Sequence, residues 1–108
     1  MQENNEGLLD NDETILVMVH KRIRKHAGYD LDSLEITRAL GDLGYPLTED
    51  EVLGGLGHLK REGYLRAFED TDDSNRSGPR IVRYWGLEIT PEGAMKAIDL
   101  MNQFRYGA

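Results

Sequence analysis

Apolar side chains recur every three to four residues in four stretches of the chain, which predicts four helices with one apolar face each. We place these helices at residues 12–26, 33–43, 48–62 and 91–104. The apolar stripes of the first three are Ile15, Leu16, Val19 and Ile23; Ile36, Leu40 and Leu43; and Val52, Leu56 and Leu59. Residues 15–19 also have the β-branched character of a strand, but the helical period continues beyond them, so we favour a helix.

Capping signals agree with these helix boundaries. Thr48 is followed three residues later by Glu51, which is the pattern of a capping box, and Leu47 and Val52 fit the hydrophobic staple around it. The other predicted caps are Asp32 before the second helix, Thr90 before the last, and Gly28, Gly44 and Gly63 at helix ends.

Two segments alternate between apolar and polar residues, as strands do. They are Tyr64–Glu69 and Ile81–Ile89, and the stretch between them, residues 70–80, is rich in Asp, Ser, Asn, Gly and Pro. We therefore predict a β-hairpin with a long loop. The loop is acidic in its first half and basic in its second, so internal ion pairing is an alternative to partner binding for its arginines.

The charge is concentrated at one end of the chain. The net charge is -7, from 20 acidic and 13 basic residues, and five of the acids precede the first base, Lys21. The remaining 15 acids nearly balance the 13 bases, so the body can still carry a basic face. We expect residues 1–9 to form a disordered acidic tail and residues 10–108 to form one domain.

Composition also excludes several classes of protein. The chain has no cysteine, which rules out disulfides and thiolate metal sites. It lacks a long apolar run and the basic-then-apolar order of a signal peptide, so we expect no membrane association and a cytoplasmic location. The residues supply no nucleophile with its base, no spacing of histidines that suits a metal and no phosphate-binding loop. We expect neither an enzyme nor a cofactor.

The order helix, helix, turn, helix, strand, loop, strand, helix is accompanied by two local motifs. Leu59-Lys60-Arg61-Glu62-Gly63-Tyr64-Leu65 closes the third helix, and Ile89-Thr90-Pro91-Glu92-Gly93 opens the last. Together they resemble the winged helix-turn-helix superfamily, an α+β fold, and most closely its small bacterial and archaeal PadR-like and MarR-like regulators. The resemblance covers roughly residues 12–104.

The resemblance implies a dimeric DNA-binding transcriptional regulator. The third helix would enter the major groove, the hairpin wing would touch the minor groove or backbone, and the last helix would form the dimer. The residues expected to contact double-stranded DNA are His58, Lys60 and Arg61 from the helix and Arg76, Arg80 and Arg83 from the wing. The wide apolar arc of the last helix predicts a homodimer seam at Ala97, Leu100, Met101 and Phe104, joined by Val17 and Met18, unless the domain buries these residues internally.

The outer face of the third helix offers few side chains that read bases. We predict this face to consist of Asp50, Glu51, Gly54, Gly57, His58 and Arg61. Its glycines, with Gly55, indicate either close approach of DNA or a partner helix, or a crowded crossing with the second helix. The acids would repel phosphate. A winged-helix module that binds another protein is therefore the alternative function.

A second basic cluster lies at the end of the first helix. It comprises Lys21, Arg22, Arg24 and Lys25 between His20 and His26. Such a cluster is found in nucleic-acid-binding patches, and cations also stabilise a helix C-terminus through the helix dipole. We favour the second interpretation, because the first helix usually lies behind the recognition helix in winged-helix proteins.

Overall fold

A computed structural model describes residues 10–25, 30–74 and 78–104 of the chain. Within these ranges it contains helices α1 (Asn11–Lys25), α2 (Ser33–Asp42), α3 (Glu49–Arg61) and α4 (Pro91–Phe104). Strands β1 (Leu65–Asp72) and β2 (Arg80–Ile89) form a two-stranded antiparallel hairpin between α3 and α4. The α+β class and the order of elements are as predicted, and each helix begins and ends within a residue or two of its predicted bounds. The predicted tail, residues 1–9, and the helix end at Gly28 lie outside the described residues.

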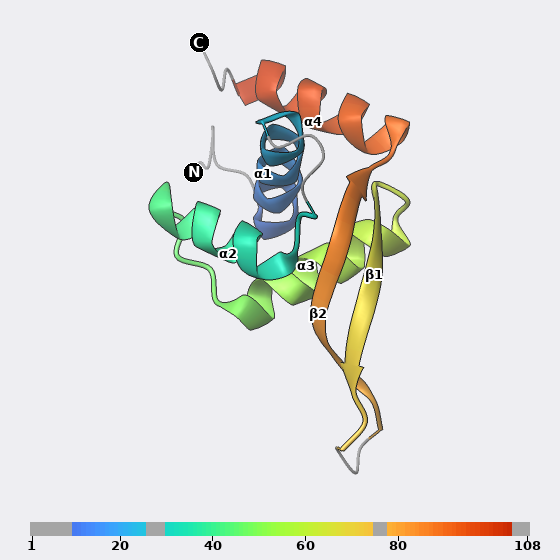
Figure 1. The fold of residues 1–108 in the computed structure, drawn as a ribbon. Helices are drawn as coiled ribbons and strands as arrows, with labels where there is room; N and C mark the ends of the chain where they lie inside the picture. Colours follow the sequence, from blue (N-terminus) through green and yellow to red (C-terminus); the bar gives the residue numbers. More distant parts are fainter. Residues whose placement is uncertain (1–9, 26–29, 75–77, 105–108) are drawn as a thin grey trace, which may run out of the picture.

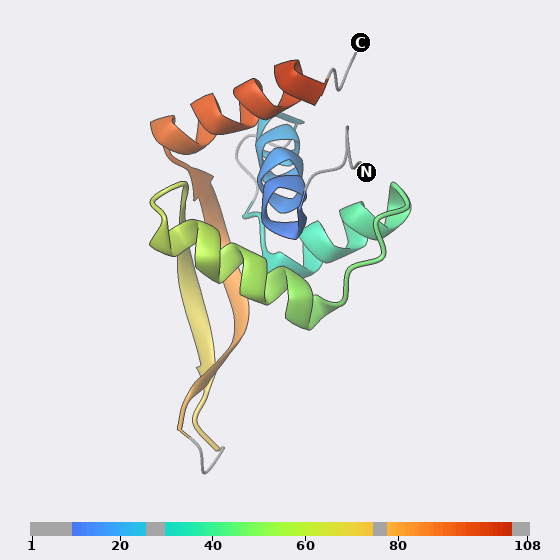
Figure 2. The same ribbon diagram turned by 180° about the vertical axis from the view of Figure 1, so that it is seen from behind.

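Helix α1 is the centre of the molecule. It contacts α2, α3, α4 and β2, and Figures 1 and 2 show α4 crossing one end of it while α2 and α3 lie toward the other. Its residues Thr14–His20 are all buried in an unbroken run. A helix with neighbours on several sides is buried over more than one stripe, so the single stripe predicted for it underestimates its burial.

Burial of α1 also removes part of the predicted dimer seam. Val17 and Met18 are 6% and 5% exposed, so they belong to the core of one subunit and are unavailable to a second. The same correction applies to α4, where Ala97 and Leu100 are 0% and 3% exposed. Met101 is half-buried against the core, and the side chain of Phe104 lies outside the described set.

The apolar residues that α4 does present to solvent are different ones. Met95 is 72% exposed and Ile98 is 47% exposed. They lie on the side of the helix away from Ala97 and Leu100, because residues one or two positions apart in a helix point in different directions. Met95 and Ile98 are therefore the exposed large apolar side chains of α4 that a second subunit could cover.

Caps fix the helix boundaries as the sequence predicts. The Thr48 hydroxyl accepts a hydrogen bond from the Glu51 N–H at 3.1 Å, and the Thr48 N–H donates to the Glu51 carboxylate at 2.8 Å, which confirms the capping box. The Asp32 carboxylate accepts the Glu35 N–H at 2.9 Å. At the other end of α3, Gly63 has a φ of 84°, a conformation that glycine adopts without strain.

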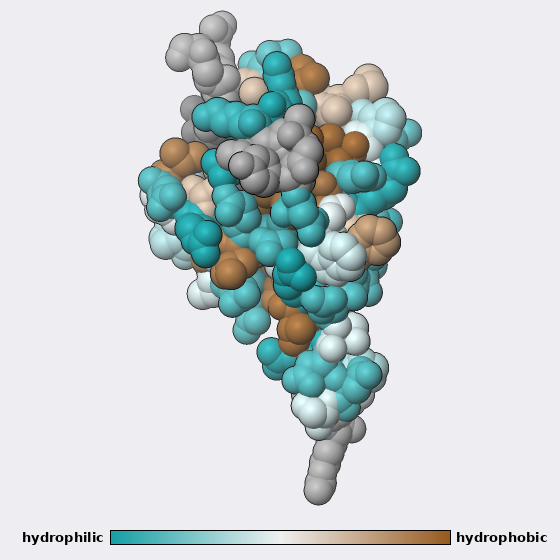
Figure 3. All heavy atoms as spheres, in the orientation of Figure 1, coloured by the Kyte–Doolittle hydropathy of each residue, from teal (hydrophilic) through white to brown (hydrophobic). Residues whose placement is uncertain are grey.

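The hairpin is longer than the alternation of apolar residues predicts. Opposite charges face one another across its outer half, because the register pairs Asp70 with Arg83 and Asp72 with Arg80. Cross-strand pairs of this kind stabilise a sheet. They extend both strands into the stretch predicted as loop. The hairpin runs past α3 and projects beyond the helices (Figures 1 and 2), and its projecting part is mostly hydrophilic (Figure 3).

Candidate nucleic-acid interface

The candidate interface combines the C-terminal half of α3 with the hairpin. Helix α3 contacts both strands. Tyr84 of β2 is 3% exposed beneath α3, and the Lys60 ammonium lies 5.8 Å from the centroid of its ring. Burial, and then the nearby Glu69 carboxylate, raise the pKa of Tyr84, so its phenol stays protonated at neutral pH. The position of α3 on the hairpin is thus set by a buried aromatic side chain.

Glycines let α3 approach its neighbours closely. A Cβ at Gly57 would lie 2.7 Å from the Tyr84 hydroxyl, and one at Gly55 would collide with Ile15 of α1. Gly57 is therefore buried, which corrects its predicted place on the outer face. The crowded crossing predicted for Gly55 exists, but its partner is α1 and not the second helix. Gly54 is exposed, with no atom near a Cβ added there.

Two of the three predicted contact residues on α3 are held by carboxylates. His58 Nδ1 is hydrogen bonded to Asp12 at the start of α1, and its Nε2 lies 3.6 Å from Glu62. The Lys60 Nζ donates to the Glu69 carboxylate of β1 at 2.7 Å. These bonds connect α3 to α1 and to the hairpin, so both side chains have a structural partner.

Arg83 is held most firmly of the predicted wing residues. Its Nε and Nη2 donate to Asp32 at 3.3 and 3.1 Å, and its Nη1 donates to Asp70 at 3.3 Å. The hydrogen bond to Asp32 is the largest cause of a raised pKa of Arg83, and the bond to Asp70 adds to it. Because Asp32 caps α2, Arg83 ties the hairpin to α2.

Arg61 and Arg80 remain as exposed cations at the two parts of the interface. Neither forms an ion pair with any residue that the structure describes, although Asp72 lies opposite Arg80 in the register. Arg76 lies outside the described residues. The six predicted contact residues thus divide into three that are engaged by carboxylates, two that are open and one without a described position.

Acidic and aromatic side chains are also exposed on α3 and on the hairpin. Glu49, Asp50 and Glu51, the whole first turn of α3, are exposed. On the hairpin, Phe68 is 62% exposed and stacks on Trp85 with ring centroids 4.7 Å apart. This aromatic pair was not identified from the sequence. The signal in the sequence was a large aromatic residue, Phe68, next to the charged residues Glu69 and Asp70.

The described residues contain no group of three or more His, Asp or Glu side chains that could hold a metal ion. Nor does any described helix have the length and apolar character needed to cross a membrane. No protein-family model matches the chain, and no curated protein is significantly similar to it.

Proposed function

We propose that the protein is a winged helix-turn-helix regulator of transcription, which binds double-stranded DNA with the C-terminal end of α3 and the hairpin as its wing. One observation carries the proposal: α3 lies against a projecting hairpin, and each of the two presents an arginine outside any described ion pair, Arg61 and Arg80. Arginine is the side chain best suited to phosphate and guanine contacts.

Cations that are paired with carboxylates, such as Lys60, can also contact DNA when it is present. The Lys60 and Glu69 side chains are 34% and 37% exposed. Exposed ion pairs contribute less than about 1 kcal/mol, so a phosphate can replace the carboxylate at low cost. The acidic first turn of α3 repels phosphate, and the duplex therefore lies nearer the end of the helix than its start.

Arg61 and Arg80 should both contribute to duplex binding. The double variant Arg61→Ala/Arg80→Ala is expected to bind a duplex about tenfold more weakly than the parent at moderate salt, because two phosphate contacts are lost. Fluorescence anisotropy with a labelled duplex measures this. Lys25→Ala is the matched control, since it removes an exposed cation from α1, and its affinity should equal that of the parent. Unchanged affinity in the double variant would remove both arginines from the interface.

We also propose a homodimer, formed through the exposed part of α4. Its support is the adjacent exposure of Met95 and Ile98 on one helix, flanked by Lys96 and Asp99, which can pair with each other across a two-fold axis. Sedimentation equilibrium should give a dimer for the parent and a monomer for Ile98→Glu. A parent that is monomeric at high concentration would contradict this arrangement.

A module that binds another protein is the second candidate function. The exposed acids of the first turn of α3 and the exposed ring of Phe68 favour it, because aromatic side chains are enriched in protein interfaces. If no duplex is bound at low salt, while a protein partner is retained by the parent and released by Phe68→Ser, this function replaces the first.

A further inference from the structure

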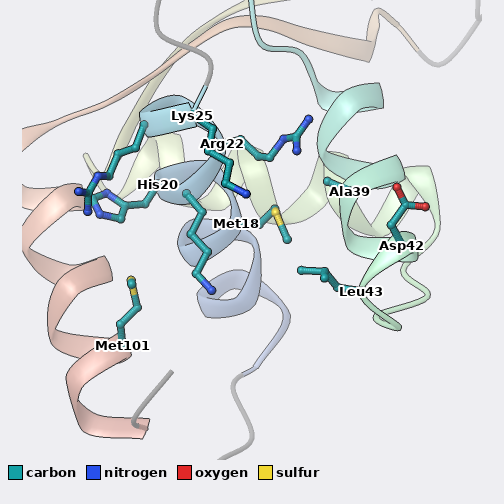
Figure 4. A pocket seen from close by; sticks show the side chains of 10 residues that line it. Met18, His20, Arg22, Lys25, Ala39, Asp42, Leu43 and Met101 are labelled. Carbon is teal, nitrogen blue, oxygen red and sulfur yellow. The ribbon is translucent and has the colours of Figure 1, made fainter. Parts of the chain in front are cut away.

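A pocket of about 630 Å³ lies over α1 on the side that faces the gap between α2 and α4. Figure 4 shows Met18 and Lys25 of α1 at its centre, Ala39 of α2 and Leu43 after it on one side and Met101 of α4 on the other. Its volume falls in the range of small-molecule sites. The proposed contacts with DNA lie on α3 and the hairpin, so this pocket is separate from them.

Part of the pocket lining is apolar. Met18 is buried and Met101 is half-buried, and both are flexible side chains that adapt to the shape of a ligand. Leu43, which follows the last residue of α2, is 60% exposed at the rim. A hydrocarbon group placed between α2 and α4 would lie over Met18 and remove the apolar surface of Leu43 and Met101 from water.

The charged part of the lining is predominantly positive. Arg24 and Lys25 line the pocket and form no ion pair with any residue that the structure describes. Arg22 is hydrogen bonded to Glu35, and Asp42 is the one carboxylate among the described lining residues. In a chain with a net charge of -7, such a concentration of cations over an apolar floor favours a ligand of opposite charge.

A buried polar group at the same place points to a missing partner. His20 also lines the pocket, is 6% exposed, and has no hydrogen-bond partner for either ring nitrogen among the described residues. Burial, and then the charge of Arg24, lower the pKa of His20, so the ring is neutral at pH 7. Buried polar atoms without partners are rare in native proteins. An anionic group beside Arg24 would give the buried His20 ring a hydrogen-bond acceptor.

We propose that the pocket binds a small organic anion with an aliphatic body, its carboxylate beside Arg24 and Lys25 and its hydrocarbon along Met18, Leu43 and Met101. A carboxylate makes strong charge-assisted hydrogen bonds to a guanidinium and an ammonium group. The basic cluster of α1 then has a role beyond the helix dipole. The proposal does not depend on DNA binding, because it uses other residues and is tested by direct binding.

Titration of the full chain with sodium octanoate tests this site, with calorimetry for affinity and methionine methyl NMR signals for location. We expect saturable binding that shifts the signals of Met18 and Met101 and leaves that of Met95, on the exposed side of α4, in place. Uncharged 1-octanol should bind at least fivefold more weakly than octanoate, because it cannot pair with the cations.

Two variants separate the charged and apolar contributions. Arg24→Gln/Lys25→Gln is expected to weaken octanoate binding at least fivefold, and Leu43→Ser severalfold, and both fold because these side chains are exposed. Arg66→Gln, which removes a cation from the hairpin, is the matched control and should bind as the parent does. The proposal is overturned if octanoate does not saturate the parent, if the double variant binds with parental affinity, or if the shifts centre on Met95.

Discussion

Replacement of Gly93 by alanine is expected to destabilise the protein by about 3 kcal/mol or more, the upper end of the cost of overpacking. A Cβ at this position would collide with the carbonyl oxygen of Tyr64, and would lie 2.9 Å from the carbonyl carbon of the same residue and from Cγ1 of Ile89. Backbone atoms cannot rotate aside as a flexible side chain does. The clash must therefore move α4 or the turn between α3 and β1.

Such a movement would break the bonds that join these two segments. The Thr90 hydroxyl donates to the Gly63 carbonyl at 2.7 Å and accepts the Gly93 N–H at 3.0 Å, while the Thr90 N–H donates to the Tyr64 carbonyl at 3.1 Å. The start of α4 is thereby fixed to the turn that follows α3. The cost of the substitution consequently includes hydrogen bonds as well as the steric clash.

Urea unfolding of Gly93→Ala and Gly54→Ala measures this effect against an internal standard. Both variants replace a helical glycine, but a Cβ at Gly54 would have no neighbour within 4 Å. Alanine is favoured over glycine in a helix by about 1 kcal/mol, so Gly54→Ala should be slightly more stable than the parent. Equal stability of the two variants would show that α4 does not pack on Tyr64 as described.

Replacement of Asp32 by alanine is the second large effect, with an expected loss of about 1–2 kcal/mol from the N-cap of α2 alone. One carboxylate oxygen accepts the Glu35 N–H and the other accepts two N–H groups of Arg83. Alanine removes all three acceptor contacts. The variant should therefore lose both the cap and the ion pair that joins the hairpin to α2.

Asp32→Asn separates the two roles of this side chain. Asparagine is as good an N-cap as aspartate, but it carries no charge for Arg83. Its loss of stability, measured by urea unfolding, should be smaller than that of Asp32→Ala and should vanish at high salt, where the ion pair is screened. If the two variants lose equal stability at low and high salt, the cap contributes nothing and the account of α2 is wrong.

The helices could be predicted closely because their signals are local. The capping box at Thr48 and Glu51 and the glycine at position 63 act within a few residues of the backbone groups that they satisfy. The end of the hairpin could not be predicted in this way. Its extension depends on which acid of β1 faces which arginine of β2, and that register is a property of the folded pair of strands.

The candidate interface was predicted less well, because its electrostatics arise from tertiary contacts. His58 is bonded to Asp12 and Arg83 to Asp32, pairs that are 46 and 51 residues apart in the sequence. A pattern of cations along a chain does not reveal which of them already have an acidic partner. The apolar arc of α4 was ambiguous for a similar reason, since the contacts of α1 decide that Ala97 and Leu100 face inward.

The salt dependence of duplex binding tests the central claim, DNA binding through the end of α3 and the wing, most directly. For each phosphate that is neutralised, the slope of log affinity against log salt concentration changes by about -0.9. We predict that the parent binds duplex at low salt, and that Arg61→Ala/Arg80→Ala has a slope shallower by roughly 1.8, because two contacts are lost. Absence of binding at low salt, or the same slope for both proteins, would contradict the account.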